Sequence, residues 1–342
     1  MYCLLVKVQN KHRFVKYKCN WYGTLQPAFN FEYSKLKNME THAITLPASH
    51  YRKLEKIVTA LIEKWDTHYI ICFGCVEESK ATTSCFPGSN NEGSARYYLL
   101  MITTEDHRIE NQVQDYVDTH YPEVSITFAV HGLKQVTHGV NQGSRFYAVA
   151  CRYGMQLYSR SGLCLDLNYH QINPATTLVN AEERYHHHYG LALGFWQSAG
   201  HSFETEYYSI AVFLLHQAVE HACKALVRVY TAYHYEMHNI GRLLDLCLLF
   251  SDELSHALPR RTDEDKRLFA LLRDGYSKTR YDYNFVVKSA DADTLLTRVK
   301  ELLDVTEKLG LATIVEYRTQ AQEAAIAHNP STDINTQTPY AS

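Results

Sequence analysis

Polar side chains in the second half of the chain have the types and spacing of a buried ion-pair network or of a ligand site. His216, Glu220 and Lys224 recur every four residues, so a helix would place them on one face. In one interpretation, Glu220 pairs with Lys224 or with the distant Arg280 and locks helices together. In the other, Lys224 and Arg280 hold a phosphate while Tyr281 stacks on a base. Both interpretations stay open, and the candidate ligand-binding residues are His216, Gln217, Glu220, Lys224, Arg280 and Tyr281.

Three other motifs are better explained by structural roles than by redox activity or metal binding. Cys72 and Cys75 have C-x-x-C spacing, but they follow an apolar strand, whereas a redox pair opens a helix after one. His186 to His188 are consecutive, so they cannot all face one point on a helix, and we expect an exposed face there. His238 is expected to cap or pack at the start of a helix. We therefore predict no metal and no cofactor.

Length and charge limit the classes of protein that this chain can belong to. With 342 residues it should hold about two domains. Its 34 Lys and Arg against 37 Asp and Glu give a net charge of −3, so any nucleic-acid role must rest on a local patch. The sequence contains no apolar run of 18 residues, and its nine cysteines do not have the dense spacing of a disulfide framework. We predict a cytoplasmic protein with no membrane partner.

The first half of the chain alternates predicted helices and strands. Apolar residues recur at helical steps from Pro47 onward. Short apolar runs predict core strands at 68–74, 97–102 and 125–130, and a polar helix is expected at 106–120. This alternation is typical of an α/β unit.

The second half of the chain is helical throughout. Apolar residues line one face of about five helices between residues 180 and 309, which predicts a helical bundle. Beyond residue 320 the chain lacks an apolar face, so a disordered tail is expected. The predicted fold class is α+β, with an N-terminal extension at 1–38, a small α/β domain at 39–170, an all-α bundle at 171–319 and the tail at 320–342.

The order of these elements resembles two known domain families. The Phe73-Gly74 turn, followed by the strand at 98–102, resembles the minimal nucleotidyltransferase fold. The helical half resembles a HEPN domain, through the segments 216–220, 224–226 and 279–281. Fusions of the two domains form a recognised family of Bacteroidetes type, and the resemblance covers residues 39 to 310.

The resemblance implies a degenerate nucleotidyltransferase site. The metal-binding Asp-x-Asp pair of the family aligns with Arg96 and Tyr98. The third strand offers Ser125 and Thr127 where another carboxylate is expected, and Cys75 replaces the serine of the turn. The alternative is a nucleotidyltransferase with substitute carboxylates, for which the loop offers Glu77, Glu78 and Glu92.

HEPN domains are often metal-independent ribonucleases with an Arg-x4-6-His motif on a late helix. Arg273 and Arg280 lie on that helix, but no His follows either of them within reach. Arg228 and His234 have the spacing at another place and keep a ribonuclease as an alternative. The resemblance therefore implies a non-catalytic nucleotide- or RNA-related binding protein in stress or defence physiology of the toxin–antitoxin kind. It also implies a homodimer through the bundle, with an aromatic surface from Tyr207, Tyr208, Tyr230, Tyr233 and Tyr235.

Overall fold

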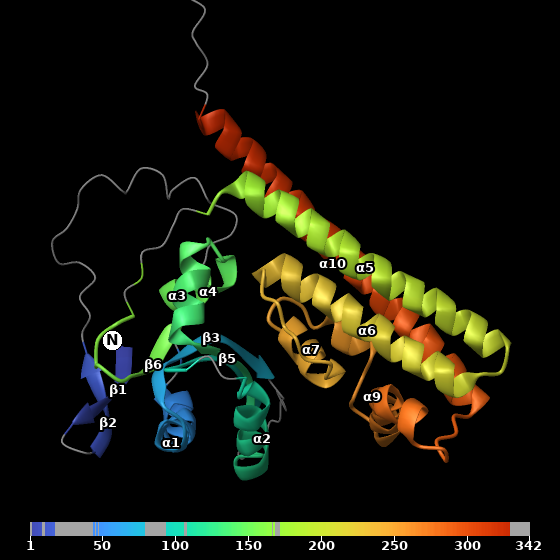
Figure 1. The fold of residues 1–342 in the computed structure, drawn as a ribbon, viewed down its shortest axis with the longest axis horizontal. Coiled ribbons are helices and arrows are strands. Elements are labelled where there is room, and N and C mark those ends of the chain that lie inside the picture. The colour runs from blue at the N-terminus through green and yellow to red at the C-terminus, as the bar shows by residue number, and fades with distance from the viewer. Residues whose placement is uncertain are drawn as a thin grey trace, which may run out of the picture.

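The computed structural model describes residues 2–8, 11–17, 44, 46, 48–78, 94–105, 108–165, 167 and 172–328. It consists of a sheet region followed by a helical bundle, as Figure 1 shows. The α+β fold class predicted from the sequence is confirmed.

The sheet has six strands in the order β2-β1-β6-β3-β4-β5. The hairpin formed by β1 and β2 adds the N-terminal extension to the edge of the sheet at β6. In the central part, β3 is antiparallel to both β4 and β6, whereas β4 and β5 are parallel. The strands are β1 (Tyr2–Val8), β2 (Lys11–Tyr17), β3 (Thr67–Glu78), β4 (Ser94–Thr103), β5 (Ser125–Gly132) and β6 (Met155–Ser159).

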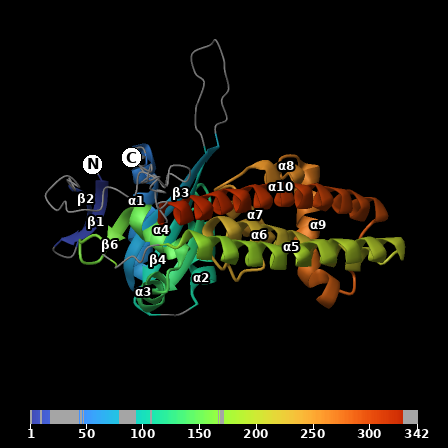
Figure 2. The same cartoon turned by 90° about the horizontal axis from the view of Figure 1, so that it is seen from above.

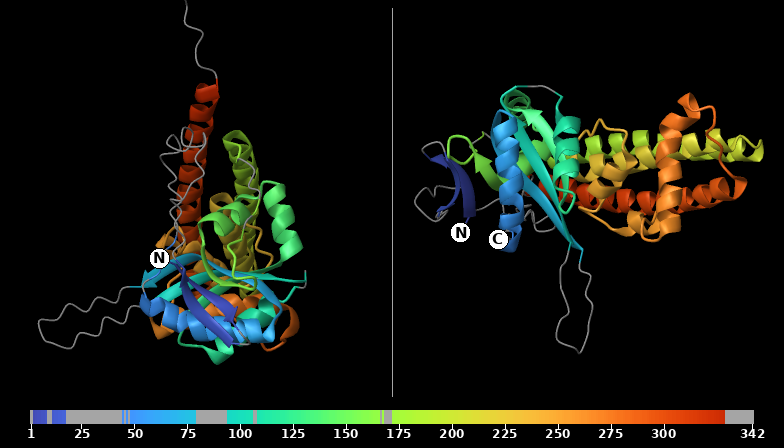
Figure 3. Two further views of the ribbon diagram at one scale, coloured as in Figure 1. Left: turned by 90° about the vertical axis from the view of Figure 1, so that its left-hand side faces the viewer. Right: turned by 90° about the horizontal axis from the view of Figure 1, so that it is seen from below.

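Helices cover both faces of the sheet, which explains why β4 is a continuous apolar run rather than an alternating one. Leu99 and Met101 of β4 pack with the helices α1 (Ala48–Lys64) and α2 (Glu110–His120). Tyr98 and Leu100 point to the opposite face. There they pack with α3 (Leu133–Asn141) and α4 (Arg145–Tyr153). Figure 3 (right) shows α1 and α2 from below the sheet.

The bundle contains six helices, one more than the pattern predicted, in the described part of the chain. Asn173 caps α5, because its side chain accepts hydrogen bonds from the amides of Ala175 and Thr176. Thr262 and Asp265 form a reciprocal capping box at the start of α9. The helices are α5 (Pro174–Glu204), α6 (Tyr208–Thr231), α7 (Ile240–Cys247), α8 (Glu253–Ala257), α9 (Asp263–Tyr281) and α10 (Ser289–His328).

The last helix differs from the predicted boundary. α10 continues to His328, so part of the predicted tail at 320–342 is helical. The rest of that tail, from 329 onward, lies outside the described residues.

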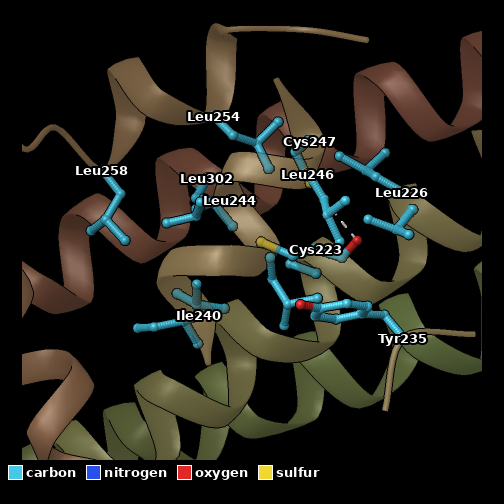
Figure 4. Close-up of a cluster of buried hydrophobic side chains, with 14 of the residues drawn as sticks. Cys223, Leu226, Tyr235, Ile240, Leu244, Leu246, Cys247, Leu254, Leu258 and Leu302 are labelled. Atoms are coloured by element: carbon cyan, nitrogen blue, oxygen red, sulfur yellow. Dashed lines mark hydrogen bonds between the residues drawn. The ribbon is translucent and has the colours of Figure 1, made fainter. Parts of the chain in front are cut away.

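The helix α6 forms the centre of the bundle and packs against α5, α7, α9 and α10. Figure 2 shows α5, α6 and α10 running side by side away from the sheet. Where α6, α7, α8 and α10 meet, leucines and two buried cysteines fill the core, as Figure 4 shows. α6 is also long and apolar enough to cross a membrane, but 67% of its apolar stretch is buried in the bundle, which is typical of a core helix in a soluble protein.

The sheet and the bundle share one hydrophobic core. A single cluster of buried side chains includes Tyr98 and Leu100 of β4 together with Leu226 and Leu246 of the bundle. The close approach is visible at Gly74, where a Cβ atom would overlap with Leu249 and Tyr98. A side chain at this position of β3 would therefore displace Leu249, which shows how closely the strand approaches the segment that follows α7.

Candidate functional site

Glu220 is the centre of a buried polar network in the bundle. Its side chain is only 2% exposed, and Lys224 Nζ lies 2.6 Å from its Oε1 atom. His238 Nδ1 lies 3.0 Å from the same oxygen, and Gln217 Nε2 donates to Oε2 at 3.4 Å. Burial by itself would raise the pKa of Glu220, but the hydrogen bonds and charges of Lys224 and His238 hold it below its ordinary value. The carboxylate is thus ionised and compensated inside the protein.

His216 connects this network to α9. It is 1% exposed, and its Nδ1 atom donates to the backbone oxygen of Leu272 at 3.2 Å. Its ring stacks on Tyr276 with 4.9 Å between centroids. Burial lowers the pKa of His216, so the ring is neutral at pH 7 and acts as a link between two helices.

Arg280 and Tyr281 lie apart from Glu220, on the surface at the end of α9. The guanidinium group of Arg280 lies 4.4 Å from the ring centroid of Tyr276, and it lies 5.7 Å from that of Phe213. Its Nε atom donates to the backbone oxygen of Tyr276 at 2.9 Å. Tyr281 is 76% exposed, and the Arg280 guanidinium also lies 5.1 Å from its ring centroid. No carboxylate within the described residues pairs with Arg280.

The structure thus divides the six predicted residues into two groups. His216, Gln217, Glu220 and Lys224 form the internal network, whereas Arg280 and Tyr281 form an exposed cation and aromatic surface. Tyr276 lies between the groups because His216, His238 and Arg280 all contact its ring. The pairing of Glu220 with Lys224 agrees with the first interpretation, and no ion pair joins Glu220 to Arg280 in the described residues.

Sequence reasoning did not assign His238 to this network. The residue was expected to cap or pack at a helix start, yet it binds Glu220 and stacks on Tyr276. Asn239 caps α7 instead, since its side chain accepts from the amide of Arg242. A polar residue beside a helix start has no sequence signal for such a contact, because the partner lies on another helix.

The helix α7 packs against the strand positions where the resemblance places metal carboxylates. Arg96 Nη1 lies 2.9 Å from Asp245 Oδ2, and the Tyr98 hydroxyl donates to the backbone oxygen of Asp245. Arg260 Nη2 binds the other carboxylate oxygen of Asp245 at 2.7 Å. The two residues aligned with Asp-x-Asp therefore attach the sheet to the bundle.

A polar cavity of about 240 Å³ lies beside this contact. Arg242 of α7 extends into its wall and binds Asp115 at 3.0 Å and Asp118 at 3.3 Å. Thr127, which stands at the predicted third carboxylate position, is buried in the same wall. The remaining lining residues include Gln114, Ser125, Arg96 and Asp245.

The structure describes the side chain of only one of the three proposed substitute carboxylates. Glu77 is exposed on β3, and its Oε1 atom is 3.7 Å from His50 Nε2. The side chain of Glu78 and all of Glu92 lie outside the described residues. Across the portions of the chain that the structure describes, no group of three or more His, Cys, Asp or Glu side chains is arranged to hold a metal ion.

The C-x-x-C cysteines are free thiols with little reactivity. Cys72 is buried and its Sγ donates to the backbone oxygen of Gly74 at 3.2 Å. Burial raises the pKa of Cys72 to about 12 and that of Cys75 to about 11, so neither forms a thiolate at pH 7.

The three consecutive histidines point in different directions, as successive residues of a helix must. His186 and His187 are exposed, whereas His188 is 8% exposed and points between α5 and α6. His188 Nε2 accepts from Arg228 Nη1 at 3.4 Å, and its Nδ1 lies 3.3 Å from His221 Nδ1. Burial, followed by the charge of Arg228, lowers the pKa of His188 to about 3. Arg228 thus contacts His188, while His234 lies exposed beyond the end of α6.

The tyrosines expected at a dimer surface are largely internal. Tyr233 is 7% exposed and Tyr235 is 2% exposed, so both belong to the core. Tyr208 and Tyr230 are half-buried, and Tyr207 is exposed. The predicted aromatic interface is therefore wrong for Tyr233 and Tyr235, while homodimerisation stays a prediction.

Comparison with known proteins identifies the helical half. Residues 185–309 match the family model of the HEPN domain, so the bundle is a HEPN domain. The chain is also similar to a nucleotidyltransferase-like protein from Exiguobacterium sibiricum 255-15, whose crystal structure matches with 13% identity over 82% of this chain and 81% of that chain, at a TM-score of 0.21. No curated protein matches. The HEPN domain supports a nucleotide- or RNA-related function in general.

Proposed function

We propose that this protein is a non-catalytic nucleotide- or RNA-binding protein whose ligand contacts Arg280 and Tyr281. The observation that carries this proposal is the exposed Arg280 guanidinium, which lies over aromatic rings with no carboxylate partner among the described residues. An arginine held in this way keeps its two terminal nitrogens free for bidentate binding of a phosphate.

The neighbouring aromatic side chains suit a nucleobase. Tyr281 is 76% exposed, and Tyr283 is fully exposed, so both rings are open to solvent. Bases of single-stranded RNA stack on such rings, and each stacked base contributes about 1–3 kcal/mol of binding free energy. Phosphate and base would then be recognised within a few residues of each other at the end of α9.

The Arg280→Lys substitution tests this site. It retains the charge but removes the planar fork, so we expect binding of a nucleotide or short RNA to weaken by about 1–3 kcal/mol, or roughly fivefold to 150-fold. The matched control is Arg273→Lys on the same helix, where Asp274 already neutralises the arginine at 2.9 Å. Absence of any nucleotide or RNA binding by the wild-type protein would refute the proposal.

The non-catalytic character is supported by the cleft between the sheet and α7. A cation at position 96 repels Mg²⁺, and Asp245 is already neutralised by two arginines. We expect no incorporation of labelled ATP with Mg²⁺ or Mn²⁺. Incorporation that Glu77→Ala or Glu92→Ala abolishes would favour the nucleotidyltransferase alternative.

A ribonuclease based on Arg228 and His234 is the other enzyme alternative. In the structure, Arg228 donates to His188 rather than to His234. We expect RNA to stay intact during incubation in EDTA, and cleavage that His234→Ala removes would establish the ribonuclease. A role in stress or defence physiology is part of the proposal and rests on the HEPN domain alone.

We also propose a homodimer through the bundle. Apolar side chains are exposed along the two longest helices, with Val179 of α5 at 61% and Val315 of α10 at 56%. A second copy would remove such side chains from water. Light scattering at micromolar concentration should give twice the chain mass of 39.4 kDa, and a monomer mass would contradict the dimer.

A further inference from the structure

One side of α6 carries a stripe of partly buried side chains between α5 and α9, four of them polar. Phe213, Gln217, His221, Lys224 and Arg228 follow one another at steps of three or four residues, so they lie along the same side of the helix. None of the five is fully buried. The opposite side of α6 packs into the core, and Figure 1 shows α5 and α9 flanking the helix.

Arg280 touches one end of this stripe, and Arg228 occupies the other. The Arg280 guanidinium lies 5.7 Å from the ring centroid of Phe213. The helix rises by about 22 Å over the residues from Phe213 to Arg228. A stacked single strand with a rise of about 3.4 Å per nucleotide would span this distance with roughly six nucleotides.

Arg228 is only partly satisfied by the protein. Its Nη1 atom donates to His188 Nε2 at 3.4 Å, while its Nε atom is buried with no hydrogen-bond partner among the described residues. Because His188 Nε2 accepts this bond, the proton of the neutral ring lies on Nδ1 and is directed to His221 Nδ1. The two histidines therefore orient Arg228 without neutralising it.

A second arginine lies beside Arg228 in the described structure. Arg184 stands one helical turn before His188 on α5, so it lies on the face of α5 that contacts Arg228. Burial lowers the pKa of Arg228, and the charge of Arg184 lowers it further. Three carboxylates in this area have other partners: Glu220 binds Lys224, Glu182 binds Arg318 and Glu236 binds Arg108. Glu183, which precedes Arg184 in the chain, is exposed and forms no ion pair with either arginine. Arg184 and Arg228 thus have no counter-ion among the residues that the structure describes.

We propose that Arg184 and Arg228 form a second anion site, which binds a backbone phosphate of a single-stranded RNA that also contacts Arg280 and Tyr281. This inference rests on the proposed function and specifies its ligand class as an oligonucleotide that follows the α6 stripe. An incoming phosphate would accept hydrogen bonds from the free guanidinium nitrogens and neutralise both arginines. A mononucleotide or dinucleotide is too short to reach both ends of the stripe.

The test compares oligo-uridines of two and eight nucleotides in fluorescence anisotropy titrations. Arg184→Gln and Arg228→Gln should each weaken binding of the octamer by about tenfold and leave binding of the dimer unchanged. Arg184 makes no hydrogen bond to the described residues, so its variant is expected to fold even if Arg228→Gln disturbs the contact with His188. Lys308→Gln is the charge-matched control, because Lys308 pairs with Glu253 at 2.8 Å on the α8 and α10 side of the bundle, away from the stripe (Figure 2).

Salt dependence gives an independent readout. The slope of log affinity against log salt for the octamer should decrease by about 0.7 for each phosphate contact removed. Equal octamer binding by Arg184→Gln, Arg228→Gln and wild type would overturn the second site while leaving the Arg280 site intact. Failure of the wild type to bind either oligonucleotide would instead refute the proposed function.

Discussion

The two arginine-rich regions of this protein differ in whether their charges are compensated. In the cleft between the sheet and α7, Arg96 and Arg260 both bind Asp245, and Arg242 binds Asp115 and Asp118. Along the α6 face, Arg184, Arg228 and Arg280 have no carboxylate partner among the residues that the structure places. The first region holds the fold together, and the second is available to an external anion.

The difference has an energetic origin. A charge that is removed from water needs a partner of opposite charge. Between the sheet and α7, carboxylates of the protein itself are the partners of the arginines. An arginine without such a partner stays uncompensated until a ligand anion binds, as at Arg228, whose Nε atom is buried with no hydrogen-bond partner among the described residues. Charge compensation thus separates the two regions, although both contain several arginines.

The largest effect should come from removing the anion of the buried network. Glu220→Ala leaves Lys224 and His238 without their acceptor, and we expect a loss of about 3 kcal/mol in the free energy of unfolding. Urea denaturation followed by circular dichroism measures it. Glu204→Ala, which removes an exposed carboxylate beside His201, is the control and should change nothing measurable. Equal stability of Glu220→Ala and wild type would show that the network is dispensable.

Breaking the contact between the sheet and α7 should have the next largest effect. Asp245→Asn leaves Arg96 and Arg260 uncompensated at side-chain exposures of 19% and 29%, so we expect a loss of about 2 kcal/mol. Glu236→Gln breaks the exposed pair with Arg108, which also joins the sheet region to the bundle, and should have little effect. RNA binding should be unaffected by Asp245→Asn if the two regions are independent.

The two regions should also respond oppositely to pH. On the sheet side, burial raises the pKa of Glu110 to about 7, although the amide of Val130 and the charge of Arg242 oppose the rise. The folded state therefore holds this proton more tightly than the unfolded state, in which the pKa is near 4.5. Stability contributed by the protonated group is present below about pH 4.5 and is lost as the pH rises towards 7, by on the order of 2–3 kcal/mol.

Comparing Glu110→Gln with wild type tests this expectation. Glutamine stays neutral at every pH. The free energy of unfolding of the variant should therefore increase relative to that of wild type as the pH rises from about 4.5 to 7. A constant difference between the two proteins over that range would show that Glu110 titrates normally.

His188, in the bundle, should make the free energy of unfolding depend on pH in the opposite direction. Its pKa is lowered to about 3 by burial and by Arg228, while the unfolded value is 6.5. The stability linked to the neutral ring is present above about pH 6.5 and is lost as the pH falls. The difference in unfolding free energy between wild type and His188→Gln should therefore shrink on acidification from pH 7 to 5. A pH-independent difference would contradict the buried neutral ring.

The smallest effect should be that of Arg280→Lys on stability. Arg280 is exposed and makes one side-chain hydrogen bond, to a backbone oxygen, so the melting temperature should change by no more than about 1 °C. A loss of several degrees by differential scanning fluorimetry would place Arg280 among the structural arginines and remove the contrast between the two regions.

The sequence by itself determined features that depend on neighbours along the chain. Helical spacing fixed His216, Glu220 and Lys224 on one face, because residues four apart meet in any helix. Apolar runs located the core of β3, β4 and β5 in the same way.

Only the tertiary structure decided which distant residues meet. The short helices α3 and α4 and the strand β6 were not predicted, since such short segments have too few periods to distinguish them from loops. The contacts of Asp245 with Arg96 and of Arg228 with His188 join residues from different elements. Arg280 contacts Tyr276 and not Glu220 in the described residues for the same reason. The packing angle of two helices, which local spacing does not encode, sets which of their side chains touch.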